Sequence, residues 1–198
     1  RKEIYRAFTE GRAAAAAGIF ANLKLNGQYN MGDLVPAKAL KNSSKNQRSK
    51  VTATLRVAAP SWVRPREAMI YVNGKQVAQK TIDSTLNRPT DQTLEFSIEL
   101  PPHDAYIVAF VLGDGITLPG WTTYGKATQA ITNPIFIDVD GDSKYSAPRT
   151  TAKRLIAEHE IQGEKLTPAL QKILLESEAV KADSAVLLHV KDLLKQGD

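Results

Sequence analysis

The feature that most constrains this chain is an alternation of apolar and polar side chains with a period of two. It recurs in short runs, among them IFANLKL (19–25), VTATLRVAA (51–59) and TLEFSIEL (93–100). Successive side chains of a β-strand point to opposite faces of a sheet, so each run predicts a strand with one buried face. About seven such strands follow one another, separated by turn residues and with few helical patterns between them. This spacing predicts a mainly β fold, an immunoglobulin-like antiparallel β-sandwich.

Three of these stretches have individual features. The stretch REAMIYVNGKQVAQKTI (66–82) predicts a hairpin, because a type I′ turn requires positive φ at both central residues and favours the pair Asn73-Gly74. AYIVAFVLG (105–113) is apolar throughout, which predicts a strand covered on both faces. A last strand is expected through ITNPIFIDVD (131–140). Its proline lacks a backbone donor and belongs at an edge, a bulge or the strand start.

A sandwich without cysteine has no disulfide between its layers, so side-chain packing must hold the two sheets together. Aromatic side chains bury a large apolar area per residue. They are therefore the candidates for the bulk of this core, namely Trp62, Tyr71, Phe96, Tyr106, Phe110 and Phe136.

Helical periodicity appears near both ends of the chain. Ile4 and Phe8 lie one turn apart and Gly11 suits a C-cap, so a short amphipathic helix is expected before the first strand. Residues 149–198 also carry apolar side chains at helical spacing, with a threonine-proline pair that suits a helix start. The sequence thus predicts a β-sandwich domain preceded by a short helix (1–148), followed by a helical appendage.

Composition narrows the classes of function. The chain is 42% hydrophobic and 24% charged, as ordinary globular proteins are. No apolar run approaches the roughly 20 residues that a membrane helix needs, so no membrane span is predicted. The lack of cysteine excludes thiolate zinc sites and cysteine nucleophiles. It leaves a cytoplasmic and a periplasmic or secreted location both open.

The net charge of +5 is concentrated in one stretch. PAKALKNSSKNQRSK (36–50) carries five cationic side chains and no acidic one. A surface for nucleic acid would interleave aromatic rings with such cations for base stacking, and this stretch has none. We expect a solvated loop between strands and no nucleic-acid partner.

Three aspartates, Asp138, Asp140 and Asp142, alternate at the end of the last predicted strand, which is the spacing with which calcium loops begin. Two positions depart from that template, because Ser143 stands in place of a glycine and Arg149 in place of the bidentate glutamate. The pattern therefore favours an Asx-rich turn leading off the strand. Calcium held by the three carboxylates is the alternative, since carboxylates this close repel one another unless a cation or hydrogen-bond donors offset their charge.

The remaining candidates are the histidines and two aromatic residues. His103, His159 and His189 do not form a metal-ligand spacing, and the sequence contains no nucleophile elbow or phosphate-binding loop. The glycine-rich connection before the last strand carries Trp121 and Tyr124. Exposed rings there would stack on a sugar or anchor a protein interface. The alternative is that both rings fold back over one end of the sandwich.

Several segments together resemble a known family. YRAFTEGRAAAAAGIF (5–20), LKLNGQYNMGDLV (23–35), IYVNGKQV (70–77) and AITNPIFIDVDGDSKYSAP (130–148) follow in the order found in the C-terminal part of PHP-superfamily metallohydrolases. The similarity is to the bacterial carbaryl-hydrolase-like (CehA/McbA) branch and covers roughly residues 3–148. In that family a helix and a strand leave the catalytic barrel, and a β-sandwich follows.

The resemblance implies an accessory domain. The metal-binding histidines and aspartates of the family belong to the upstream barrel, and no part of this chain matches them. We therefore expect a non-catalytic β-sandwich that packs on a PHP-like catalytic barrel in the same or a neighbouring chain. In the family the three aspartates mark the exit from the last strand.

Two other functions stay open. One is a module that binds a carbohydrate or another part of the cell envelope, with Trp121 and Tyr124 as a stacking platform and calcium near Asp138. The other is a hydrolase in its own right, which would need a polar cleft at His103. Solvent exposure of the two rings discriminates the first, because buried rings cannot stack on a sugar.

Overall fold

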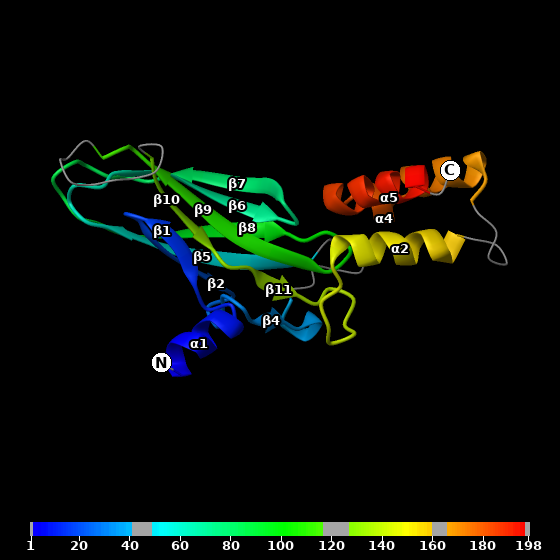
Figure 1. Cartoon of the computed structure of the whole chain (residues 1–198), viewed down its shortest axis with the longest axis horizontal. Coiled ribbons are helices and arrows are strands. Elements are labelled where there is room, and N and C mark those ends of the chain that lie inside the picture. The colour runs from blue at the N-terminus through cyan, green and yellow to red at the C-terminus, as the bar shows by residue number, and fades with distance from the viewer. Residues whose placement is uncertain (1, 41–48, 117–126, 160–165, 197–198) are drawn as a thin grey trace.

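A computed structural model of the chain describes residues 2–40, 49–116, 127–159 and 166–196. Two facing β-sheets form the body of the molecule, and helices lie near both ends of the chain (Figure 1). The predicted mainly β fold with a sandwich, an N-terminal helix and C-terminal helices is therefore confirmed. The seven-stranded sheet contains β1 (Ala14–Ala17), β4 (Leu34–Val35), β6 (Pro65–Val72), β7 (Lys75–Thr81), β9 (Ala105–Gly113), β10 (Thr128–Thr132) and β11 (Ile135–Ile137). The four-stranded sheet contains β2 (Phe20–Leu25), β3 (Tyr29–Asn30), β5 (Lys50–Ala59) and β8 (Thr90–Glu99).

Each sheet is organised around one long strand. β9 pairs with β6 along one side, and with β10 and then β11 along the other. β5 lies between β2 and β8 in the four-stranded sheet. The strand pairs are antiparallel except for the short pair of β11 with β4, which is parallel.

The Asn73-Gly74 turn joins β6 to β7 as predicted. Asn73 has φ of 47° and Gly74 has φ of 81°, the positive values that a type I′ turn requires. Val72 and Lys75 pair directly on either side of the turn. The strong local preference of this dipeptide therefore decides the geometry of the hairpin.

The last strand differs from its prediction, because the expected run through residues 131–140 is divided into β10 and β11. Pro134 lies between them and directly precedes β11, so it stands at a strand start, one of the places expected for a proline. Its carbonyl accepts a hydrogen bond from the backbone N–H of Gly32 (2.8 Å). β10 and β11 thus pair with successive parts of β9 rather than forming one continuous strand.

The core between the sheets is aliphatic, which corrects the prediction of an aromatic core. Of the six aromatic candidates only Phe96 is buried. Trp62 is 45% exposed, and Tyr71, Tyr106, Phe110 and Phe136 are partly exposed. The fully buried large side chains are instead Ile19, Leu23, Leu25, Val35, Leu55, Ile70, Ile98, Leu100, Ile107, Ile135 and Ile137, together with Leu174 in the helices.

β9 shows why the core is aliphatic and not aromatic. Its burial alternates, with Ile107, Ala109 and Val111 facing the other sheet, and Tyr106 and Phe110 on the outer face. The expectation that this apolar strand is covered on both faces is therefore wrong for the described structure. When both faces of a strand are apolar, the sequence does not indicate which face meets the other layer, and here the face without aromatic residues does.

The helices form two groups. α1 (Lys2–Thr9) ends close to Gly11, which has φ of 68° as the predicted C-cap. The C-terminal helices are α2 (Pro148–His159), α3 (Pro168–Glu176), α4 (Glu178–Lys181) and α5 (Ser184–Gln196), and α2 and α5 lie beyond one end of the sandwich (Figure 1). They enclose a small core of their own, which contains Ala152, Leu155, Leu166, Leu174, Val180, Val186 and Val190. Within the described ranges, no helix is both long and apolar enough to cross a lipid bilayer.

Candidate functional site

The acidic segment is located where the sandwich meets the C-terminal helices. Asp138 directly follows β11, and β11 pairs with the start of β9 through Ile137 and Ala105. This pairing brings Asp138 beside Asp104, the residue before β9. Asp104 and Asp138 are both almost fully buried, whereas Asp140 and Asp142 are exposed.

The loop after β11 is built from side-chain hydrogen bonds to its own backbone. The Asp138 carboxylate accepts the N–H groups of Gly141 (2.6 Å) and Ser143 (3.1 Å). Asp140 accepts the N–H of Asp142 (3.3 Å), and Asp142 in turn accepts that of Lys144 (2.8 Å). These are the bonds of the Asx-rich turn that the sequence favours.

Asp104 is the residue of this site that sequence reasoning missed. One of its oxygens accepts the N–H groups of Val139 (2.8 Å) and Asp140 (3.5 Å), and the other accepts that of Ser146 (2.8 Å). Burial raises the pKa of Asp104, and the nearby Asp140 charge acts in the same direction, while the backbone donors from Ser146 and Val139 lower it. Asp104 therefore holds both ends of the acidic loop.

Three carboxylates approach closely enough to share a cation, but they are not the three that the sequence suggests. Asp104, Asp138 and Asp140 each offer an oxygen within 4.8 Å of the others, and Asp142 is outside this group. Oxygen ligands of this kind suit calcium or magnesium. The same carboxylates already accept backbone N–H groups, which offset their charge without an ion.

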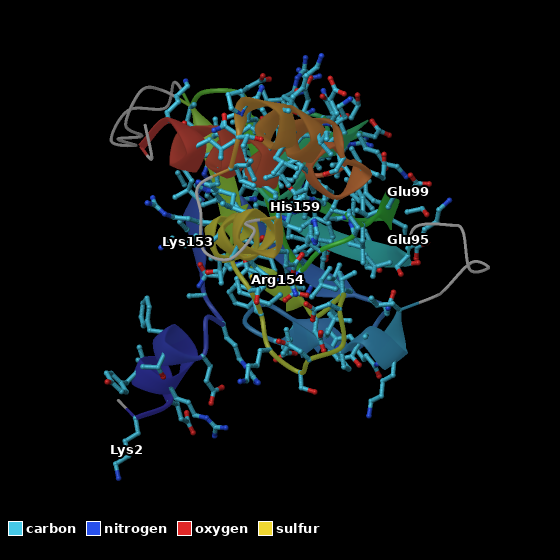
Figure 2. All side chains as sticks on the ribbon, turned by 90° about the vertical axis from the view of Figure 1, so that its right-hand side faces the viewer. Lys2, Glu95, Glu99, Lys153, Arg154 and His159 are labelled. Carbon is cyan, nitrogen blue, oxygen red and sulfur yellow. The ribbon has the colours of Figure 1, made fainter. Side chains whose placement is uncertain are left out.

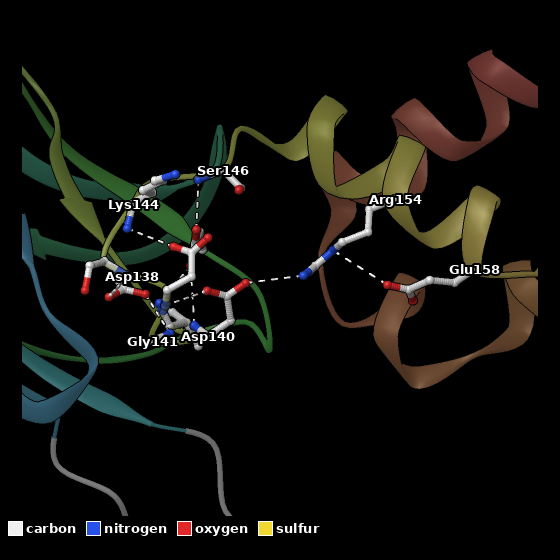
Figure 3. A network of polar contacts seen from close by, with 11 residues as sticks. Asp138, Asp140, Gly141, Lys144, Ser146, Arg154 and Glu158 are labelled. Atoms are coloured by element: carbon white, nitrogen blue, oxygen red, sulfur yellow. Dashed lines mark hydrogen bonds and ion pairs between the residues drawn. The ribbon is translucent and has the colours of Figure 1, made fainter.

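A cationic side chain also faces this group. The Nη1 atom of Arg154, on α2, lies 3.4 Å from an oxygen of Asp140, and its Nε atom lies 3.8 Å from Glu158 on the same helix (Figure 3). An arginine this close competes with a bound cation for Asp140. The geometry thus fits a structural connection between loop and helix at least as well as a metal site.

A second polar cluster joins the hairpin to α5. Asn73 is buried, and its Nδ2 atom donates to the Asp183 carboxylate (2.7 Å) and to the carbonyl of Asp104 (3.3 Å). Its Oδ1 atom accepts the N–H of Tyr106 (3.0 Å). Asp183 also caps α5, because its other oxygen accepts the N–H of Ala185 (2.9 Å). One amide side chain therefore connects β6, β9 and the start of α5.

The histidines do not come together as a catalytic or metal-binding group. His103 is buried and its Nε2 atom lies 2.6 Å from the carbonyl oxygen of Ala179, so the ring must donate there. In α2, the Nδ1 atom of His159 donates to the carbonyl of Leu155 (2.8 Å), one turn earlier. Among the described residues, the one group able to share a metal ion contains carboxylates alone. His103 thus connects the segment before β9 to α4.

Tyr145 lies against Phe136, with ring centroids 4.7 Å apart, in the segment that leads from the acidic loop to α2. Its burial, with smaller contributions from the charges of Tyr106, Asp104 and Asp183, raises the pKa of its hydroxyl from 10 to about 12. The unfolded state therefore releases this proton first, and stability falls as the pH rises from about 10 to 12.

We expect Tyr145→Phe to remove this dependence. Between pH 8 and pH 11 the native chain should lose about 1 kcal/mol more unfolding free energy than the variant, measured by urea denaturation at each pH. At pH 8 the two proteins should have similar stability, because no described hydrogen bond of the hydroxyl is lost. An equal loss in both proteins at pH 11 would show that Tyr145 is not the group responsible.

Trp121 and Tyr124, the predicted stacking platform, lie outside the described residues, so their exposure stays a prediction. Most of the basic stretch, residues 41–48, lies outside them as well. Of the three predicted aspartates, Asp138 and Asp140 belong to the group that could share a cation, together with Asp104, and Asp142 lies outside it.

Comparisons with protein-family models, with curated proteins and with solved structures found no match. The candidate sites therefore rest on the chemistry of this chain alone.

Proposed function

We propose that the chain is a non-catalytic accessory β-sandwich domain of a PHP-like metal-dependent hydrolase, and that it packs on the catalytic barrel through α1. The observation that carries this proposal is the apolar face of α1. Ile4 is 65% exposed, Tyr5 is 73% exposed and Phe8 is 70% exposed. None of the described residues of α1 is buried, and the helix stands apart from the body of the molecule (Figure 2, where Lys2 marks it).

A helix in this position needs a partner. Eight residues are too few to form a stable helix in water by themselves, because nucleation is costly and few hydrogen bonds follow it. Burying three large apolar side chains would stabilise it by about 1.5–3 kcal/mol each. The exposed face therefore fits a surface supplied by another domain.

Ion pairs connect the end of α1 to the sandwich. Arg6 pairs with Glu10 (2.5 Å), and Arg12 pairs with Glu10 (3.2 Å) and with Asp33 (3.6 Å), just before β4. Exposed pairs of this kind each contribute little to stability. Of these pairs, only that of Arg12 with Asp33 reaches the sandwich, and it links the segment between α1 and β1 to the residue before β4.

The proposal also accounts for the chemistry of the described residues. The buried carboxylates of Asp104 and Asp138 accept backbone N–H groups, and His103 donates to a backbone carbonyl. Each of these groups therefore has a structural contact that accounts for its burial without a catalytic role. Metal ligands and catalytic groups would then come from the barrel.

Photo-crosslinking tests the docking. With benzoylphenylalanine in place of Tyr5, we expect an adduct with a PHP-type catalytic domain in cells of the source organism, identified by mass spectrometry. The same group at Lys24, exposed on the four-stranded sheet, is the matched control and should give no such adduct. A chain that hydrolyses ester or phosphoester substrates by itself with added Mn²⁺ or Zn²⁺ would contradict the non-catalytic assignment. An adduct from position 24 but not from position 5 would contradict docking through α1.

A further inference from the structure

Three loops form a hollow at the end of the sandwich away from the C-terminal helices, on the left of Figure 1. They are the connections from β5 to β6 and from β7 to β8, and the segment directly after β9. The hollow has a volume of about 260 Å³, slightly below the roughly 300–1,000 Å³ of typical ligand sites, so it suits a single small ring. Its lining includes Trp62, Arg64, Leu86, Asn87, Asp114 and Ile116.

Hydrogen bonds between the loops hold this hollow in shape. The N–H of Asn87 donates to the carbonyl of Ser61 (2.8 Å), and the N–H of Asp114 donates to the carbonyl of Arg64 (2.9 Å). The Nε atom of Arg64 donates to the carbonyl of Ser84 (3.2 Å). Each loop is thus tied to another, so a ligand would meet a preformed site and would not have to order it.

The side chains that line the hollow include an exposed apolar surface and several hydrogen-bonding groups. Trp62 is 45% exposed and Leu86 is 54% exposed, although both are large apolar residues. Beside them Asn87 offers an amide that both donates and accepts, and Asp114 offers a carboxylate. That carboxylate is partly neutralised, because it lies 3.9 Å from the Nη1 atom of Arg64 and 3.5 Å from the Nε atom of Arg66.

We propose that this hollow binds a hexopyranose ring of a saccharide, with Trp62 as the stacking surface. A pyranose has an apolar face of C–H groups, which packs on an indole, and a rim of hydroxyls that donate and accept. The hydroxyls would pair with Asn87, Asp114 and Arg64. A purely apolar ligand would leave these polar groups without partners.

This inference does not depend on the accessory role proposed above. The hollow is formed by the loops around Trp62 and Asp114, whereas the docking surface is α1. It also differs from the platform suggested by the sequence, which consists of Trp121 and Tyr124. Sequence reasoning placed Trp62 in the core, and its exposure is what makes this end of the sandwich a candidate site.

The test is NMR titration of the full chain with methyl glycosides of glucose, galactose and mannose, each to 50 mM. The chain has two tryptophans, so Trp62→Phe assigns the two indole N–H signals. We expect one of these sugars to shift the Trp62 signal with a Kd on the order of 1 mM, as befits a small and open site. Trp62→Ala should weaken binding at least tenfold, and Asn87→Ala about fivefold.

Phe20→Ala is the matched control, because Phe20 is an exposed aromatic residue (53%) outside the hollow, and it should leave binding unchanged. Thermal melts should show that every variant is folded. The proposal is overturned if none of the sugars shifts the Trp62 signal, or if glycerol shifts it equally. Binding that survives in Trp62→Ala but is lost in Trp121→Ala would also overturn it, and would assign the ring contact to Trp121.

Discussion

Asn73→Ala is expected to lower the free energy of unfolding by about 4 kcal/mol, the largest effect that we predict for one polar side chain of this protein. The side chain of Asn73 is buried and makes hydrogen bonds to Tyr106, Asp104 and Asp183. Alanine would leave one oxygen of the buried Asp183 carboxylate without its side-chain donor, whereas the other oxygen would still accept the N–H of Ala185. Hydrogen bonds to charged groups contribute about 1.5–3 kcal/mol, and an unsatisfied buried N–H at Tyr106 adds a further cost.

The turn itself accounts for a smaller part of this loss. Asn73 has φ of 47°, which asparagine tolerates and alanine adopts at a cost of roughly 1 kcal/mol. Asn26→Ala provides the matched control, because Asn26 also has positive φ (49°). Its side chain likewise bonds to two backbone groups, those of Ala39 and Thr52, but not to a carboxylate. We expect a loss of about 2 kcal/mol there, so the difference between the variants isolates the contact with Asp183.

Urea denaturation followed by two signals distinguishes local from global loss. Helix content by circular dichroism and tryptophan fluorescence should give coincident transitions in the native chain. In Asn73→Ala the helical signal should be lost at a lower urea concentration, because α5 is tied to the sandwich through Asp183. Similar losses for Asn73→Ala and Asn26→Ala would show that the contact between Asn73 and Asp183 contributes little.

This contact illustrates which part of the fold the sequence could predict. The Asn73-Gly74 hairpin is a local property, since two adjacent residues carry the preference for positive φ. The partner of the same asparagine lies 110 positions further along the chain. No periodicity connects these positions, because their contact depends on how the C-terminal helices dock on the end of the sandwich.

The acidic site likewise combines local features, which the sequence predicts, with a long-range contact, which it does not. Asp138, Asp140 and Asp142 were visible as a local pattern, and the turn bonds that they make are local as well. Asp104 joins them through the register between β9 and β11, which pairs Ala105 with Ile137. A signal was present in the sequence, because Asp104 immediately precedes an apolar strand, but strand order and register were needed to use it.

Gly32→Ala is expected to cost at least about 3 kcal/mol, because the added methyl group would meet backbone and not a side chain that can move aside. A Cβ on Gly32 would overlap the carbonyl oxygen of Glu10, and would lie 2.9 Å from that carbonyl carbon and 3.2 Å from the carbonyl carbon of Gly11. Gly32 also has φ of 86°, in the left-handed region that favours glycine. The substitution would thus push away the segment that connects α1 to β1.

Gly27→Ala separates the cost of the left-handed backbone conformation from the cost of the steric overlap. Gly27 has a similar φ of 75°, yet a Cβ there would have no atom within 4 Å outside its immediate neighbours, so its cost is conformational and about 1 kcal/mol. The additional loss of unfolding free energy in Gly32→Ala therefore measures the steric overlap between Gly32 and the backbone of Glu10 and Gly11. Urea denaturation of both variants gives this difference directly. Equal losses would mean that the segment before β1 moves freely and does not hold α1 in a fixed direction. In that case the ion pairs of Arg12 could not orient the helix, and docking through its apolar face would require the partner to order it.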